Sequence, residues 1–184
     1  VFPSLTSLTE TNLENVLMLW QGLGYYSRAN RIYQSSKILI EFVGKNTDQD
    51  PRYWPNRIDQ WIALPGIGRS TAGGIISSAF DLPSPILDGN VKRIFSRLFA
   101  TEIKSIKDEK KLWEFSSLLI SKISPRDFNQ ALMDLGAKIC TPRKPSCSSC
   151  PLQKFCVAYA DYDPNNFPKK EMTRIKPIQE IGIG

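Results

Sequence analysis

Residues 64–72 read LPGIGRSTA and connect two predicted helices, the second of which starts at Ser70 or a neighbour. Gly66 and Gly68 allow the turn to adopt positive φ, and they leave no side chain over the backbone amides. The helix that follows directs its first N–H groups outward, so the turn forms an anion site suited to a DNA phosphate. Arg69 adds a positive charge beside this site. A plain connector between helices would also account for a lone G-x-G.

The glycine turn does not match two common nucleotide-binding motifs. It is not a dinucleotide fingerprint, because no strand precedes it and the third glycine is absent. It is not a Walker loop, because G-x-x-x-x-G-K-[ST] is missing. The wider pattern of helix, LPGIG and helix, followed by Thr71 and Ala72, resembles the helix-hairpin-helix element of DNA repair enzymes.

The composition narrows the chemistry. The 184 residues include 24 Lys and Arg against 18 Asp and Glu, and the pI near 9.2 favours a polyanionic partner. The absence of histidine excludes Ser-His-Asp and Cys-His catalysis and His-ligated metal sites within this stretch. A general acid or base is therefore a carboxylate, Lys, Tyr or Cys. No run of about 18 apolar residues occurs, which excludes a membrane span.

Four cysteines lie close together near the end of the chain. Cys140, Cys147, Cys150 and Cys156 have the spacing C-x6-C-x2-C-x5-C, which contains only one of the two short knuckles usual for zinc. The spacing favours a [4Fe–4S] cluster, with zinc second and disulfides third. The basic residues of this loop either face a phosphate or compensate the thiolate charges; they are Arg143, Lys144 and Lys154.

Asp88 and Tyr25 each have two interpretations. Asp88 precedes a predicted helix and is either an ordinary N-cap or a carboxylate that stabilises a cationic sugar; the two roles are compatible. Tyr25 lies on a glycine-flanked turn and is either a wedge between DNA bases or a core aromatic. The core role is favoured for Tyr26.

Apolar periodicity elsewhere predicts helices and no strand pair. The expected helices start at Asn12 or Asn15 and otherwise cover residues 27–44, 58–64, 70–80, 90–99, 109–123 and 125–136. Residues 158–184 are interrupted by prolines, which is typical of a linker.

Several segments, in this order, closely resemble the MutY-type adenine DNA glycosylases of the helix-hairpin-helix superfamily, which includes endonuclease III. They are GLGYYSRA (22–29), LPGIGRSTAGGI (64–75), PILDGNVKR (85–93), FNQALMDLGAKIC (128–140) and the cysteine spacing. The resemblance implies an all-α fold with a cleft for DNA between two domains. The expected domains are a partial six-helix barrel (1–85) with its hairpin (58–80), a [4Fe–4S] cluster domain (86–157) and a linker (158–184) toward a missing C-terminal domain.

The resemblance also implies an activity: hydrolysis of the N-glycosidic bond of adenine mispaired with 8-oxoguanine or guanine in double-stranded DNA. It matches Asp88 to the aspartate that stabilises the oxocarbenium ion, Asn90 to a neighbour that orders that site, and Tyr25 to the intercalating aromatic. The four cysteines match the cluster ligands. The phosphate-binding hairpin is matched by Leu64, Gly66, Ile67, Gly68, Arg69 and Thr71.

Two positions qualify this assignment. Lyase-competent relatives hold a lysine where this chain has Ser70, so we expect a monofunctional glycosylase rather than an endonuclease III-like lyase. The family's general-acid glutamate, in a segment like SE-x-MLQQT, is expected upstream of Val1, so this stretch alone could be a non-catalytic DNA-binding fragment. We expect a monomer in the cytoplasm, associated with a bacterial-type nucleoid.

Overall fold

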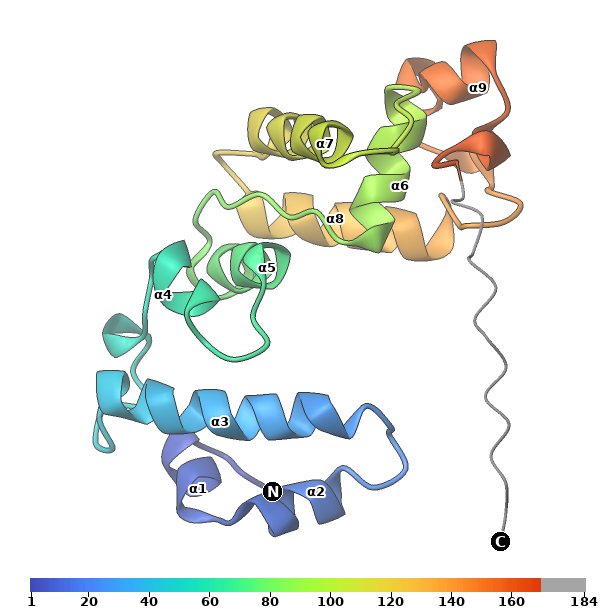
Figure 1. The fold of residues 1–184 in the computed structure, drawn as a ribbon. Helices are drawn as coiled ribbons and strands as arrows, with labels where there is room; N and C mark the ends of the chain where they lie inside the picture. The colour runs from blue at the N-terminus through green and yellow to red at the C-terminus, as the bar shows by residue number, and fades with distance from the viewer. Residues whose placement is uncertain (170–184) are drawn as a thin grey trace, which may run out of the picture. The chain divides into compact units, whose positions relative to one another are not determined.

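The computed structural model describes residues 1–169, and the regular secondary structure in this range consists of helices, with no β-strand (Figure 1). The α-helices are α1 (Leu5–Glu10), α2 (Leu13–Leu19), α3 (Tyr26–Val43), α4 (Ile58–Ile62), α5 (Arg69–Phe80), α6 (Gly89–Leu98), α7 (Ile106–Leu119), α8 (Pro125–Lys138) and α9 (Val157–Asp161). The 3-10 turns are η1 (Pro51–Tyr53), η2 (Cys147–Ser149), η3 (Gln153–Phe155) and η4 (Pro164–Asn166). The predicted all-α fold is confirmed. None of the described helices has the length and apolar character to cross a membrane.

The chain divides into two compact units. The first contains residues 1–86 and 120–129, and the second contains residues 87–119 and the chain from Gln130 onward. Helix α8 therefore begins in the first unit and continues into the second. The expected domain division at residues 85 and 157 stays a prediction. Its linker lies partly outside the described residues, since the description ends at Lys169.

The core of the first unit is built from α1, α3, α4 and α5. Their apolar residues recur at helical spacing and meet in one buried cluster. The cluster contains Leu5, Leu39, Val43, Trp61, Leu64, Ala72 and Ile76. Removing these side chains from water is the main stabilising contribution to this unit, and it fixes α4 and α5, which flank the glycine turn.

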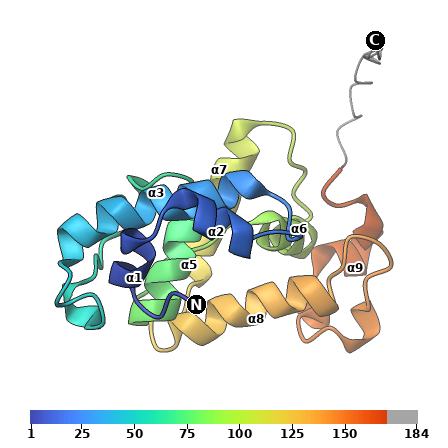
Figure 2. The ribbon, with the colours of Figure 1, turned by 90° about the horizontal axis from the view of Figure 1, so that it is seen from below.

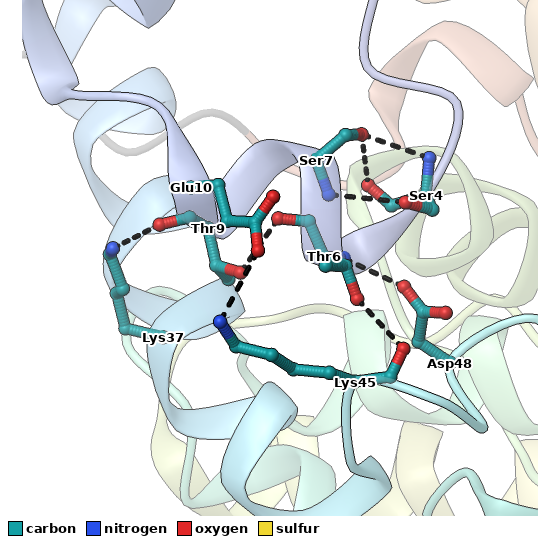
Figure 3. A network of polar contacts seen from close by, with 8 residues as sticks. All are labelled: Ser4, Thr6, Ser7, Thr9, Glu10, Lys37, Lys45 and Asp48. Carbon is teal, nitrogen blue, oxygen red and sulfur yellow. Dashed lines mark hydrogen bonds and ion pairs between the residues drawn. The ribbon is translucent and has the colours of Figure 1, made fainter.

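Polar contacts connect α1 to α3 and to the loop that follows α3 (Figure 3). Ser4 caps α1 by accepting from Ser7 N, and Asp48 accepts from Thr6 N at 2.7 Å. Lys37 Nζ donates to the Thr9 carbonyl at the other end of α1. Helix α1 was not predicted, because it is short and its capping box ends in serine rather than the usual Glu or Gln.

The second unit is organised around α6, which packs against α7 and α9. Its buried residues include Val91, Ile94 and Phe95, spaced as expected for one face of a helix. Figure 2 shows α8 leading directly into the loop that carries the cysteines and α9. Residues 158–167, the start of the expected linker, contain most of α9 and all of η4, and Ala158 and Phe167 are buried.

Helix α7 is shifted by about one turn from its predicted bounds. It begins at Ile106 rather than Glu109 because Ser105 and Asp108 form a local cap: Ser105 Oγ donates to the Asp108 carboxylate, which also accepts from Lys104 N. It ends at Leu119, so Ile123 lies in the following loop and is exposed.

Candidate functional site

The glycine turn joins α4 to α5 as predicted. Gly66 has φ +79, whereas Gly68 has φ −85 and is the N-cap of α5, so only the first glycine needs the left-handed region. Ile67 N donates to the Leu64 carbonyl at 3.2 Å, which closes the turn. A Cβ placed on Gly68 would meet no atom within 4 Å, so the space before the first amides of α5 is open. This geometry suits an anion.

The other predicted hairpin residues divide into buried and accessible positions. Leu64 belongs to the core cluster, so its side chain supports the turn rather than facing a ligand. Arg69 and Thr71 are exposed in the first turn of α5, and Ser70 between them is half-buried. Arg31 of α3 was not singled out from the sequence. Its stem lies against Gly66, since a Cβ there would meet Arg31 Cδ at 2.5 Å.

Tyr25 is at the tip of the turn before α3. It adopts φ 48 and ψ 47, and its side chain is 81% exposed. Trp20 Nε1 donates to the Gly24 carbonyl at 2.9 Å and fixes the turn from within. The Arg28 guanidinium lies over the Tyr25 ring, 5.9 Å from its centroid. An exposed ring on a rigid turn suits a wedge, and that role stays a prediction. The core role favoured for Tyr26 is wrong, because Tyr26 is 49% exposed.

Asp88 is the N-cap of α6, as one of its two interpretations required. Its Oδ1 accepts from Val91 N at 2.8 Å. The carboxylate is half-buried at the N-terminus of α6. The structure therefore orients the Asp88 side chain by this hydrogen bond, which is compatible with the catalytic role that remains a prediction.

Asn90 and Arg93 connect the start of α6 to the first cysteine. Arg93 Nη2 donates to Asn90 Oδ1 at 2.8 Å and to the Gly136 carbonyl at 2.7 Å, while Arg93 Nε donates to the Cys140 carbonyl at 2.7 Å. Partial burial lowers the pKa of the Arg93 guanidinium, and the neighbouring Cys140 acts in the opposite direction. This hydrogen bond is compatible with the ordering role of Asn90, which stays a prediction.

The segment that leads to Asp88 is fixed to α5 within the first unit. Gly73 lies against it so closely that a Cβ there would meet the Pro85 carbonyl at 2.3 Å. Asn129, only 1% exposed, donates through Nδ2 to Ser77 Oγ and to the Ser84 carbonyl, each at 2.9 Å. The sequence analysis did not single out Asn129, and Ser77 and Ser84 lie 52 and 45 residues from it along the chain.

The four cysteines line one small cavity in the second unit. All four are free thiols and half-buried, so the disulfide alternative does not apply. Within residues 1–169, no three His, Cys, Asp or Glu side chains are grouped as a site for a single metal ion. Arg97 also lines the cavity, whereas Arg143, Lys144 and Lys154 are exposed and do not.

The electrostatics of the thiols fit a cationic iron centre. Burial raises the pKa of Cys147, and the other three cysteines raise it further. Burial likewise raises the pKa of Cys156. A bound metal supplies the positive charge that lets cysteine thiols become thiolates. The residues present therefore fit an iron–sulfur cluster.

Comparisons with known proteins agree with two features described above, the helices around the glycine turn and the cysteine loop. Residues 1–117 match the HhH-GPD superfamily base excision DNA repair proteins. Residues 140–156 match the iron–sulfur binding domain of endonuclease III, which supports the predicted [4Fe–4S] cofactor.

Curated relatives carry the name adenine DNA glycosylase. One from Buchnera aphidicola (subspecies Schizaphis graminum) is 42% identical over 95% of this chain and 49% of its own length. One from Mus musculus is 41% identical over 86% of this chain and 30% of its own length. The chain thus spans about half the length of the Buchnera relative, and less of the mouse protein.

Solved structures of the same fold include two DNA repair proteins. A thermostable thymine-DNA glycosylase superposes with a TM-score of 0.70 at 26% identity, covering 85% of this chain and 70% of its own. A non-covalent endonuclease III–DNA complex gives a TM-score of 0.66 at 25% identity, with 86% and 71% covered.

Proposed function

The chain belongs to the HhH-GPD superfamily of base excision DNA repair proteins, and from this premise we propose that it acts in adenine excision from DNA. The observation that carries the proposal is the agreement among relatives. Those from bacteria and mammals that align with 86–95% of the chain at 41–42% identity are named adenine DNA glycosylase. By comparison, the solved thymine-DNA glycosylase and endonuclease III structures are only 25–26% identical to this chain.

Duplex DNA is the partner that the first unit suits. The open space before α5 leaves room for a phosphate at the N-terminus of this helix, and Arg69 and Arg31 place cations near the glycine turn. Tyr25 is available to enter the base stack. An enzyme that acts on a base must extrude it from the duplex, and a phosphate grip with an aromatic wedge serves that step.

Asp88 supplies the chemistry that the chain itself contributes. Cleavage of the N-glycosidic bond develops positive charge on the deoxyribose, and a fixed carboxylate stabilises that charge. Capping by Val91 N holds the Asp88 carboxylate in place before substrate binds. Ser70 has no amine, which supports hydrolysis without strand cleavage. When bound, the cluster joins the loop of residues 140–156 through iron–thiolate bonds.

The finer features are part of the same proposal. The substrate is adenine paired with 8-oxoguanine or guanine, and the protein is a monomer associated with the nucleoid in the cytoplasm. The general acid is a glutamate upstream of Val1, because the leaving adenine needs a proton.

The test is a single-turnover assay of adenine release from a duplex with an adenine–8-oxoguanine pair. The 184-residue chain is compared with a version extended upstream of Val1, and each is combined with Asp88→Asn. We expect the extended version to be faster, and Asp88→Asn to lower its rate roughly a hundredfold or more. Asparagine also caps helices, so thermal unfolding of Asp88→Asn should match the unsubstituted protein.

Two outcomes would contradict the proposal. Equal rates with and without the upstream extension would place the general acid within residues 1–184. Unchanged rates in Asp88→Asn would remove the aspartate from the reaction. If the 184-residue chain releases no adenine but still binds the duplex, it is a DNA-binding fragment.

A further inference from the structure

Arg97 is a buried cation at the centre of the second unit. Arg97 is only 2% exposed. The other basic residues at the start of the same ten-residue helix, Lys92 and Arg93, are more accessible. Arg97 lies three residues after Ile94 and therefore falls on the apolar face of α6. A fully buried charge is costly unless it is hydrogen-bonded and compensated.

The hydrogen bonds of Arg97 reach the cysteine loop and the segment after α9. Nη1 donates to Cys140 Sγ at 3.3 Å and to the Thr141 carbonyl at 2.8 Å. Nε donates to the carbonyls of Pro164 and Phe167 at 2.8 and 3.0 Å. The backbone of the same residue also takes part, because Cys156 Sγ donates to the Arg97 carbonyl at 3.5 Å. One residue thus touches the sulfurs of the first and the last cysteine.

The charge of Arg97 has no carboxylate partner in the part of the chain that the structure describes. None of the ion pairs among residues 1–169 includes it. Its partners there are neutral carbonyls and the sulfur of Cys140. Those carbonyls satisfy its donors but do not neutralise its charge, and an anion bound in the cavity would compensate it.

A cluster held by four thiolates is a net anion, and it would occupy the cavity that Arg97 lines. The exposed cations of the loop cannot replace Arg97, because water screens them and they do not line the cavity. Hydrogen bonds to cluster sulfurs and nearby positive charge both favour the more reduced, more negative state of a cluster.

We propose that Arg97 is the positioning residue of the iron–sulfur centre: it donates an N–H···S hydrogen bond to Cys140, compensates the cluster charge and fastens residues 164–167 over the loop. The iron–sulfur assignment itself rests on the cysteine set and its family match. The role of Arg97 is therefore separable from it and from adenine excision.

The test measures the cluster directly in the purified 184-residue chain. Arg97→Gln removes the charge, and Arg97→Lys keeps the charge but loses the planar fork. Lys92→Gln is the matched control, because it removes a charge from the same helix at a residue that pairs with Glu109 and touches no cysteine. The readouts are the midpoint potential by voltammetry, the iron–thiolate vibrations by resonance Raman, and the rate at which a chelator bleaches the visible absorbance.

We expect Arg97→Gln to shift the midpoint potential to more negative values, to alter the iron–thiolate vibrations and to lose its cluster about tenfold faster. Arg97→Lys should show a smaller shift of the same sign, and Lys92→Gln no shift. Should Arg97→Gln fail to fold, Arg97→Lys decides alone. A potential and a vibrational spectrum unchanged in both Arg97→Gln and Arg97→Lys would overturn the proposal, and would leave Arg97 as a structural anchor only. A chain that never binds iron would instead refute the cofactor.

Discussion

At the scale of single residues, Gly66 and Gly68 show that two glycines of one turn can be required for different reasons. Gly66 needs positive φ and lies against the Arg31 stem, whereas Gly68 has extended backbone and open space around it. The sequence analysis assigned the same conformational freedom to both. The structure separates a folding requirement at Gly66 from an access requirement at Gly68.

We therefore predict that two alanine variants affect different properties, stability in one case and DNA binding in the other. Gly66→Ala should lower the free energy of unfolding by about 1–2 kcal/mol, because alanine is strained in the left-handed region. Gly68→Ala should change it by less than about 0.5 kcal/mol, yet weaken DNA binding, because the added methyl covers the first amides of α5. Denaturant unfolding and duplex titration at fixed salt measure the two effects. Equal unfolding of both variants would contradict the assignment.

Ser70 tests the assignment of the turn by gain of function. An amine introduced there would attack the C1′ aldehyde of an abasic site, release water and form an imine that borohydride reduces to a stable adduct. We expect Ser70→Lys to be trapped on an abasic duplex. Ser78→Lys, at an exposed position farther along α5, is the matched control and should not be trapped. Absence of an adduct with a folded Ser70→Lys would count against the alignment of this position.

At the scale of elements, hydrogen bonds at helix termini connect one element to another. Asp48 connects the loop after α3 to the start of α1, and it is 8% exposed. The hydrogen bond from Thr6 N is the largest cause that lowers the pKa of Asp48 below its usual 3.8. A carboxyl whose pKa is lower in the folded state stabilises the fold above its unfolded pKa, and this contribution disappears as the pH falls through the folded pKa.

Asp48→Asn should therefore lower stability at neutral pH and flatten the acid limb of the stability curve below about pH 4. Thermal unfolding from pH 7 down to pH 3 would show the two curves converging as Asp48 becomes protonated. Asp161→Asn is the control, because Asp161 is exposed at the end of α9 and takes part in none of the ion pairs among residues 1–169. A constant difference between Asp48→Asn and the unsubstituted chain over this range would exclude the titration.

At the scale of the whole molecule, each unit has its own source of stability. The first has an apolar cluster spanning four helices. The second combines the buried face of α6 with the cysteine loop, whose residues form two 3-10 turns and no α-helix between Lys138 and Val157. Short irregular loops need cross-links to remain ordered, and metal–thiolate bonds are one kind.

Removal of the cluster should accordingly affect the units unequally. After chelation, we expect faster amide exchange in residues 139–167, while α3, α4 and α5 keep their protection. Hydrogen-exchange mass spectrometry of the loaded and the metal-free chain measures this. Equal loss of protection in both units would show that they unfold as one cooperative body.

The sequence by itself determined the features that depend on neighbours along the chain. The glycine turn, the Asp88 cap and the four-cysteine spacing follow from residues within a few positions of one another, because capping and turn chemistry act over that range. Only the tertiary structure decided which side chains support these features. Arg97 meets Cys140 across 43 residues, and Asn129 meets Ser77 across 52. Helical periodicity identifies a buried face but not what that face contacts, because packing partners are chosen by the whole fold.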